Sequence, residues 1–335
     1  MQNTCNDKPK GGQVLCLPSF SQNKMMKRLI LFLCALLTLT ACGAPAAEKE
    51  VQDTFTFTDD LAREVTVSQP PARVAALIGS FADVWCIAGG KDSLVAAAGD
   101  AWTSFDLELE KEVADLGAIK EPNLEVLFAS RPDLVLASCN TQADLELQET
   151  LEKAGIAVAY FDVQHFEDYI RMLQICTRLT ERPDRYAEYG TDLSDWIYAS
   201  ISRQDDSHPT VLCIRATGAG CKVKGSEDNL LGEMLADLGC VNIADGDNAL
   251  LEDLSMEAII DADPDYIFAV LQGADAAKAQ SALENALLRN PAWSSLRAVK
   301  EGRFYTLDHA LYNLKPNANW GVAYENLADI LYPGP

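Results

Sequence analysis

The sequence is poor in histidine and lacks the motifs that mark common catalytic sites. Its three histidines are His165, His208 and His309. It contains no G-x-S-x-G, Walker A, H-E-x-x-H or G-x-G-x-x-G motif. Sites for bare zinc or manganese use several histidine and carboxylate ligands, which three scattered histidines do not supply. We therefore expect neither an enzyme nor a binder of a naked metal ion.

Basic residues are also in the minority. The chain has 27 Lys and Arg against 50 Asp and Glu, a formal net charge of −23. This balance argues against a nucleic-acid partner, whose phosphates need a basic surface. An anionic small molecule remains compatible, but basic side chains would have to be concentrated at its site. Hydrophobic residues make up 48% of the 335, which fits a folded protein, and this length predicts two domains.

A signal peptide is predicted near the N-terminus. Residues 24–28 (KMMKR) are basic, residues 29–37 form an apolar run, and small residues follow. The run is shorter than the ~20 residues that a membrane-spanning helix needs. A basic segment, a short apolar segment and small residues before a cleavage point are typical of a signal peptide. We assign the signal to residues 1–41.

The residues LTAC that end at Cys42 resemble a bacterial lipobox. In a lipobox the cysteine receives a diacylglyceryl group and becomes the first mature residue, and two acyl chains give durable anchoring. Residues 42–53 would form a tether. The resemblance implies a lipoprotein on the extracytoplasmic face of the cell membrane. Because residues 1–24 have no role in this scheme, we expect translation to start at Met25 or Met26.

The remaining cysteines do not form a recognisable disulfide pattern. Six would remain in the mature chain besides the lipidated one, namely Cys86, Cys139, Cys176, Cys213, Cys221 and Cys240. An even number outside the cell permits disulfides. Their scattered spacing and apolar surroundings favour buried thiols, however. A pair between Cys213 and Cys221, eight residues apart around a probable turn, stays open as an alternative.

The hydrophobic pattern predicts two α/β lobes. Short apolar strands are expected at 73–79, 94–98, 134–137 and 156–161, and again at 210–214, 266–271 and 303–306. Helical spacing separates them, at 80–88, 142–154, 228–239 and 254–262. Continuous apolar strands that alternate with helices indicate parallel, doubly wound, Rossmann-like sheets covered on both faces. We place the first lobe at residues 54–165 and the second at residues 206–335.

The second lobe repeats a unit of the first. Residues 124–128 form an apolar helix with a glutamate and lead to Pro-Asp and an apolar strand at 132–136; residues 256–260 and 264–268 do the same. In each copy the proline cannot continue the helix. Between the lobes, residues 166–205 show helical spacing and no strand signal. We expect a comparatively stiff helical connector there.

An ordered set of segments resembles the class III solute-binding proteins of ABC importers. The matching segments are TDDLAREV at 58–65, PARVAAL at 71–77, PNLE at 122–125, PDLVL at 132–136, NLLGEML at 229–235 and NPAWSSL at 290–296. The resemblance runs from residue 54 to residue 332. It implies two lobes joined by a long helix, with a ligand held in the cleft between them and little hinge motion.

The same resemblance implies the partners. The expected ones are an ABC permease with its ATPase and a small metal chelate, bound by a monomer with no cofactor of its own. An iron–siderophore complex is the first choice, and haem or a corrinoid of the cobalamin type is the alternative. A ligand-sensing or adhesion lipoprotein with the same fold is a rival. By position in the family pattern, Glu125 and Glu233 would contact arginines of the permease; Glu257, the echo of Glu125, competes with Glu233.

Ligand contacts are expected in the loops that follow the strands, because ligands of doubly wound sheets bind beyond the carboxyl ends of the strands. Those loops nominate a set of polar and aromatic candidates, namely Ser80, Trp102, Asn140, His165, Arg215, Tyr312 and Lys315. Trp102 could equally pack on its own lobe, and Arg215 could equally form a surface ion pair. For His165 and His309, axial ligation of haem or a corrinoid stays open.

Overall fold

The structure, a computed structural model, describes residues 53–334 except residues 106, 228, 247–253 and 274. The predicted signal peptide, Cys42 and almost all of the tether lie outside the described residues. The chain divides into the units Met1–Val51 and Gln52–Pro335, and the second contains everything below. Within the described ranges, no helix has both the length and the apolar character needed to cross a membrane.

The first lobe is built on a five-stranded parallel sheet with the order β5-β4-β3-β6-β7. Its strands are β3 (Val74–Ala76), β4 (Leu94–Ala97), β5 (Ala114–Asp115), β6 (Leu134–Ser138) and β7 (Ala157–Phe161). The middle strands β3 and β6 are buried along their whole length. Both faces of the sheet are therefore covered, as continuous apolar runs require. The helices of this lobe are α2 (Gly79–Ile87), α3 (Asp100–Thr103), α4 (Leu124–Ala129) and α5 (Gln142–Lys153).

An antiparallel hairpin precedes the first sheet. Its strands are β1 (Thr54–Thr58) and β2 (Glu64–Ser68). The turn between them is fixed by Asp59, whose carboxylate accepts hydrogen bonds from the amides of Leu61 and Arg63 at 3.1 and 3.0 Å. The sequence analysis did not foresee this pair of strands. Their side chains alternate between exposed and buried positions. Such strands contain no continuous apolar run, which was the sequence signal used for the other strands.

The second sheet is mixed. Strands β10 (Val241–Asn242), β8 (Thr210–Thr217), β11 (Tyr266–Leu271) and β12 (Phe304–Leu307) run parallel in that order, and β9 (Gly220–Lys224) pairs with β8 antiparallel. The expectation of a parallel sheet is therefore wrong for β9. The physical reason is the connection: only residues 218 and 219 separate β8 from β9, and so short a link permits an antiparallel pair alone.

Short helices cover the second sheet. They are α9 (Leu230–Asp237), α11 (Met256–Ala262), α12 (Ala276–Leu283), α13 (Arg297–Lys300) and α14 (His309–Tyr312). The two lobes together confirm the predicted α/β class, with parallel pairing dominating both five-stranded sheets.

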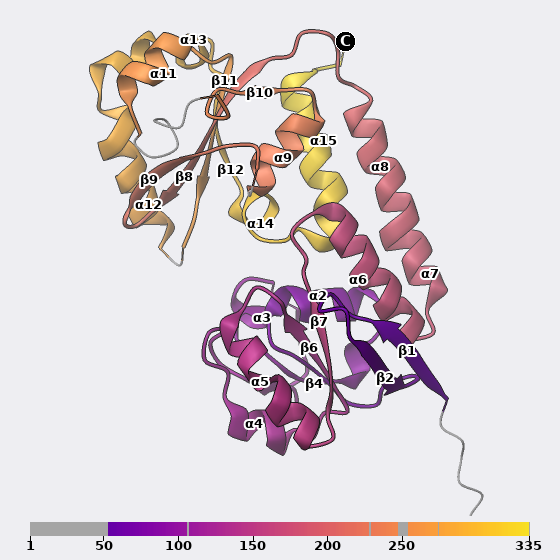
Figure 1. The fold of residues 1–335 in the computed structure, drawn as a ribbon. Helices are drawn as coiled ribbons and strands as arrows, with labels where there is room; N and C mark the ends of the chain where they lie inside the picture. Colours follow the sequence, from indigo (N-terminus) through magenta and orange to yellow (C-terminus); the bar gives the residue numbers. More distant parts are fainter. Residues whose placement is uncertain (1–52, 106, 228, 247–253, 274, 335) are drawn as a thin grey trace, which may run out of the picture. The chain divides into compact units, whose positions relative to one another are not determined.

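A helical segment follows the first lobe, as predicted. Helix α6 (Phe166–Leu179) is followed by α7 (Pro183–Tyr186), a π-helical stretch (Ala187–Thr191) and α8 (Asp192–Ile201). Pro183 occupies the first turn of α7, where its missing N–H has no cost. The last helix, α15 (Trp320–Leu331), packs along α8, and Figure 1 shows the two side by side.

The repeated Pro-Asp unit has a structural role in both lobes. Asp133, just before β6, accepts hydrogen bonds from the amides of Ala72 and Arg73 at 2.9 and 3.1 Å, next to the start of β3. Asp265, just before β11, accepts one at 2.9 Å from the amide of Thr210, the first residue of β8. In each lobe the aspartate thus satisfies amides where the neighbouring strand begins.

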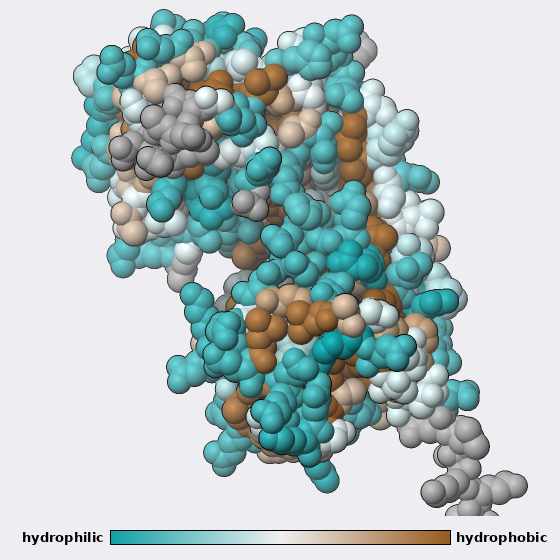
Figure 2. All heavy atoms as spheres, in the orientation of Figure 1, coloured by the Kyte–Doolittle hydropathy of each residue, from teal (hydrophilic) through white to brown (hydrophobic). Residues whose placement is uncertain are grey.

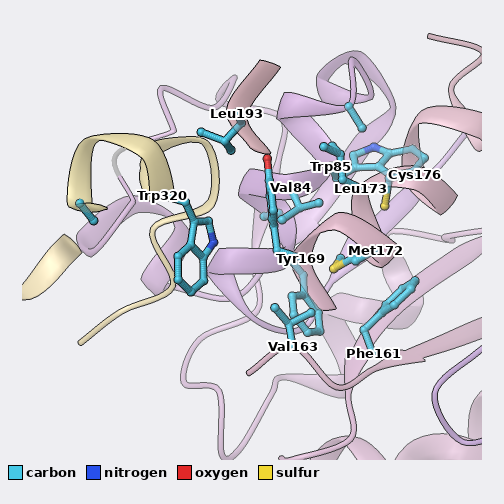
Figure 3. Packing of buried hydrophobic residues seen from close by; sticks show 14 of the residues in the cluster. Val84, Trp85, Phe161, Val163, Tyr169, Met172, Leu173, Cys176, Leu193 and Trp320 are labelled. Atoms are coloured by element: carbon cyan, nitrogen blue, oxygen red, sulfur yellow. The ribbon is translucent and has the colours of Figure 1, made fainter. Parts of the chain in front are cut away.

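One cluster of buried hydrophobic residues reaches into both lobes. It contains Val74 and Ala76 of β3, and Cys213 and Phe268 of the second sheet. Figure 3 shows part of this cluster, where Tyr169 of α6 lies between Trp320 of α15 on one side and Met172 and Leu173 on the other. The lobes therefore share a core, while Figure 2 shows that hydrophilic residues cover most of the visible surface.

Candidate functional site

A pocket of about 970 Å³ lies at the carboxyl ends of β4, β5 and β6 in the first lobe. This is the edge at which doubly wound sheets bind ligands, and the volume is within the 300–1,000 Å³ typical of small-molecule sites. Its lining combines apolar and small residues with polar side chains; the polar ones are Asp100, Thr103, Asp115, Lys120, Asn140, Thr141 and Gln142.

The close approach of two loops shapes one wall of this pocket. The amide of Gly79, at the start of α2, donates a hydrogen bond of 2.9 Å to Asp100 Oδ1. A β-carbon at Gly79 would lie 2.6 Å from the amide nitrogen of Ala101, so only glycine fits there. Burial raises the pKa of Asp100, and the hydrogen bond from Gly79 opposes this rise.

Asn140 reaches the same pocket from the loop after β6. Its side-chain amide donates a hydrogen bond of 2.7 Å to Asp162 Oδ1. The loop is anchored below by Asp144, whose Oδ2 accepts a hydrogen bond of 2.8 Å from the amide of Ser138. Asp144 is fully buried, and burial raises its pKa to about 7 although the Ser138 hydrogen bond lowers it. A buried carboxylate thus fixes the loop that carries Asn140.

Arg215 is the candidate cation of the second lobe. It lies on β8 and is half-buried, and its guanidinium donates a hydrogen bond of 3.3 Å to the side-chain oxygen of Asn229. Burial lowers the pKa of Arg215. Among the described residues, no ion pair with a carboxylate is formed by Arg215, in contrast to most other arginines of the chain. The surface ion pair considered as the alternative is not formed there.

Lys315 connects the lobes. It follows α14, and its ammonium donates a hydrogen bond to the carbonyl oxygen of Val163, in the loop that follows β7. Burial lowers the pKa of Lys315, whereas Asp162 and Asp168 raise it. Two residues later, the side-chain amide of Asn317 donates a hydrogen bond of 3.0 Å to the carbonyl of Ser80. The segment 315–317 is therefore fastened to the first lobe at two points.

A further side-chain contact between the lobes involves His165. Its Nδ1 lies 2.9 Å from Oε2 of Glu233 on α9, and both residues line a pocket of about 480 Å³. Glu233 was predicted to face a permease. The structure places its carboxylate, with 24% of the side chain exposed, against the first lobe.

Three other candidates are engaged in packing. Ser80 and Tyr312 are each only 3% exposed, and the Tyr312 hydroxyl donates a hydrogen bond of 3.0 Å to the carbonyl of Ala323. Trp102 is half-buried on α3 and packs against the shared hydrophobic cluster. For Trp102, packing on its own lobe was the stated alternative. We leave these three out of the proposed ligand contacts.

Glu125 and Glu257 occupy equivalent positions in the two lobes. Each is the second residue of its helix, and each is exposed. In both helices the side chain of the residue before the helix caps it: Asn123 accepts a hydrogen bond of 3.1 Å and Ser255 one of 3.3 Å from the amide three residues later. The repeat seen in the sequence thus also appears in the structure, because both glutamates lie at the same position of a capped helix.

The sequence reasoning missed much of the pocket in the first lobe. Asp115, Lys120 and Gln142 were not singled out. Strand β5, which carries Asp115, is two residues long and gives no apolar run, so the loop after it was not recognised as a ligand loop. The expectation that ligands bind beyond strand ends included the loop of Asp100, but Trp102 was the candidate chosen from that loop.

Neither metal ligation nor a disulfide was found in the described ranges. No group of three or more His, Cys, Asp or Glu there could hold a metal ion. All six described cysteines are free thiols. Cys213 lies opposite Lys224 in the β8–β9 ladder and Cys221 opposite Ala216, so the pair left open in the sequence analysis is not formed. Burial raises the pKa of the Cys213 thiol.

Comparison with known proteins now decides the family. The sequence profile of periplasmic binding proteins matches residues 74–311, which is most of the chain. The chain belongs to the periplasmic binding protein family. The resemblance stated from the sequence is thereby confirmed. Members of this family are binding proteins, and the pocket at the strand ends is where a bound solute is expected.

Two relatives and one solved structure illustrate the similarity. The periplasmic binding protein described here is 24% identical to the Fe(3+)-citrate-binding protein YfmC of Bacillus subtilis over 85% of this chain and 90% of that one. It is 23% identical to the probable siderophore-binding lipoprotein YfiY of the same organism, over 86% and 92%. The crystal structure of the TroA-like periplasmic binding protein FepB from Veillonella parvula aligns with a TM-score of 0.66 at 18% identity, covering 83% of this chain and 90% of that one.

Proposed function

We propose that this chain is the solute-binding component of an ABC importer and that it captures a ferric siderophore. The observation that carries the proposal is the pocket of about 970 Å³ at the strand ends of a periplasmic-binding-protein fold. The names of the relatives YfmC and YfiY, a ferric-citrate binder and a probable siderophore binder, support a metal chelate as the class of ligand. Catalysis has no part in this proposal.

The lining of the pocket suits an oxygen-rich chelate. Asn140, Thr141 and Gln142 supply amide and hydroxyl groups that can both donate and accept hydrogen bonds. Lys120 is the cation of this lining, whereas Arg215 of the second lobe, which has no carboxylate partner among the described residues, lines a different pocket. The described residues contain no cluster fit for a bare metal ion, so the metal would arrive with its own organic ligand.

A titration of the purified mature protein tests the ligand. A ferric siderophore, haem and a corrinoid have different visible absorption spectra. Quenching of tryptophan fluorescence measures the binding of each. We expect a ferric siderophore to bind more tightly than haem or cobalamin. Tighter binding of haem or cobalamin would overturn the siderophore assignment and support the alternative.

Two glutamines of α5 give a matched pair of variants for the pocket. Gln142 lines it, whereas Gln148 does not, and each donates a hydrogen bond to a glutamate four residues later, at 2.9 and 3.1 Å. Loss of one polar ligand contact weakens binding about fivefold. We expect Gln142→Ala to show this loss and Gln148→Ala to bind like the original protein. Equal affinity of both variants would place the ligand elsewhere.

For delivery we propose that Glu125 and Glu257 contact the permease. Their equivalent positions and their exposure support this pair over Glu125 with Glu233, which is engaged with His165. Two carboxylates related by the internal repeat would meet two arginine sites of a permease with twofold symmetry, and Arg–carboxylate pairs fix orientation as well as affinity. Uptake in cells also separates an importer component from a sensing or adhesion lipoprotein.

We also propose that Cys42 carries the lipid and that the protein acts as a monomer at the extracytoplasmic face of the membrane. The lipobox-like LTAC sequence supports the anchor, and the relative YfiY is named a lipoprotein. Two acyl chains on one residue would hold the binding unit beside its permease and ATPase.

A further inference from the structure

The contact between His165 and Glu233 joins two lobes that are built on separate sheets. His165 directly precedes α6, and Glu233 lies in the first turn of α9. Their side chains meet at 2.9 Å, with 54% of His165 and 24% of Glu233 exposed. Beyond this pair, the described side-chain contacts between the lobes include those of Lys315 and Asn317.

The chemistry of the pair depends on protons. An ionised carboxylate only accepts hydrogen bonds, so Nδ1 of His165 must carry the hydrogen. When the imidazole is neutral, the ionised carboxylate already makes this a charge-assisted hydrogen bond. When the imidazole is protonated, the contact becomes an ion pair and gains the Coulomb attraction between two opposite charges. The attraction between the lobes at this point therefore increases as the pH falls.

A polar network holds His165 in place. Asp168 Oδ2 accepts hydrogen bonds from the amides of His165 and Gln164 at 2.9 and 3.0 Å, and its Oδ1 accepts one from Arg171 at 3.1 Å. Arg171 is paired in turn with Asp60 at 3.0 Å. Burial alone would raise the pKa of Asp168, but these donors lower it, so it stays charged. The histidine is thus presented to Glu233 from a fixed backbone.

The charged groups that line the pocket beside the imidazole are acidic. Glu167 comes from α6, Glu227 from the loop before α9, and Glu233 and Asp237 from α9; Tyr324 of α15 donates a hydrogen bond of 2.6 Å to Asp237. The pocket they form has no Lys or Arg among its described lining residues. The Glu233 hydrogen bond raises the pKa of His165, burial opposes this, and Glu233, Asp168 and Glu167 raise it further by their charges.

We propose that Glu233 is a positioning residue that acts through His165: together they form a protonation-dependent clasp that holds the two lobes at a fixed opening. The clasp is strongest below neutral pH, where His165 is protonated, and it weakens as the pH rises. It adds a pH response to the proposed binding function and does not depend on which chelate is bound. Ligand affinity would follow the clasp only if the proposed function is correct.

The titration of His165 in the full chain tests the clasp without any ligand. With isotope-labelled histidine, the three ring signals can be followed by NMR from pH 5 to pH 9, and His165→Gln assigns the relevant one. We expect the midpoint of His165 to move to lower pH in Glu233→Gln. Glu227→Gln, a change of the same size in the same pocket, should move it less. An identical midpoint in the original protein and in Glu233→Gln would refute the contact.

Small-angle X-ray scattering of the same chain tests whether the contact positions the lobes. The radius of gyration should increase from pH 5.5 to pH 8.5 in the original protein and stay constant in Glu233→Gln. His165→Lys, whose side chain stays charged over this range, should remain compact at both values. The same increase in Glu233→Gln as in the original protein would overturn the positioning role. None of these results depends on ligand binding, so the clasp and the proposed function can fail separately.

Discussion

Nδ1 of His165 lies 2.9 Å from Oε2 of Glu233, and the two residues belong to different lobes. The carboxylate that the sequence assigned to a permease is therefore committed to the protein itself. Glu257, which repeats the helical position of Glu125, is free of such a contact to the other lobe among the described side chains. We therefore propose Glu257, which the internal repeat relates to Glu125, as the second docking candidate in place of Glu233.

Docking can be tested by removing both repeated carboxylates. We expect Glu125→Gln with Glu257→Gln to lower uptake of a ferric siderophore at least about tenfold, because two charge-assisted contacts with the permease are lost. Uptake of the labelled chelate by cells is the measurement, and affinity for the chelate in solution should be unchanged. If the single variant Glu233→Gln abolished uptake and this double variant did not, the original assignment to Glu233 would be correct.

The buried Asp144 predicts a pH-dependent stability. Its folded pKa of about 7 lies above that of an unfolded aspartate, ~3.9. The native state therefore holds the proton more tightly, and stability is lost as the pH rises from about 4 to about 7. We expect Asp144→Asn to remove this pH dependence, so that its free energy of unfolding relative to the original protein is on the order of 4 kcal/mol more favourable at pH 8 than at pH 4.

Urea denaturation at the two pH values measures this effect. Asp195→Asn, at an exposed position of α8, is the matched control. If Asp144→Asn destabilised the protein equally at pH 4 and pH 8, the contribution of Asp144 to stability would come from its hydrogen bond with Ser138 and not from its charge.

The close approach at Gly79 predicts sensitivity to a single methyl group. A β-carbon there would meet the backbone of Ala101 at 2.6 Å and the carboxyl carbon of Asp100 at 2.8 Å. We expect Gly79→Ala to cost about 1–3 kcal/mol of unfolding free energy, because overpacking displaces one wall of the pocket. Gly246→Ala, where a β-carbon meets nothing within 4 Å, is the control in thermal and urea denaturation. Equal stability of the two variants would contradict the tight packing at Gly79.

The proposed lipidation at Cys42 predicts the location of the protein in cells. Cys42→Ser removes the thiol that a lipobox cysteine uses to carry its acyl groups. We expect the variant to leave the membrane fraction and to appear in the medium or the periplasm. Fractionation followed by immunoblotting measures this, and labelling with a fatty acid should be lost in parallel. Membrane retention of the serine variant would mean that another segment anchors the chain.

The sequence predicted the regular parts of the fold because they follow from local chemistry. Strands such as β6 and β11 are short apolar runs that follow Pro-Asp, and hydrophobic spacing marks the helices of both lobes. Strand β5 and the β1–β2 hairpin were missed because two residues, or a half-exposed alternation, carry little periodic signal. Strand β9 was also missed; the two-residue turn before it requires antiparallel pairing with β8.

The candidate site was predicted only in outline, because side-chain direction is a tertiary property. The strand-end rule led to Asn140, Arg215 and Lys315, but the same rule nominated Ser80 and Tyr312, which the packing buries. The contact of His165 with Glu233 joins positions 68 residues apart. No local pattern specifies such a pair; it arises from how α6, α9 and the elements between them pack.

The shared hydrophobic cluster has a consequence for the order in which the protein forms. Helix α15 contacts the helical segment after the first lobe through Trp320, whose ring centroid lies 5.6 Å from that of Phe166, and the second lobe through Tyr324 and Asp237. It follows every described strand in the chain. The shared cluster cannot be completed until this helix has been synthesised and, for an exported protein, translocated. A nascent chain would thus stay protease-sensitive at the shared cluster until its final helix arrives.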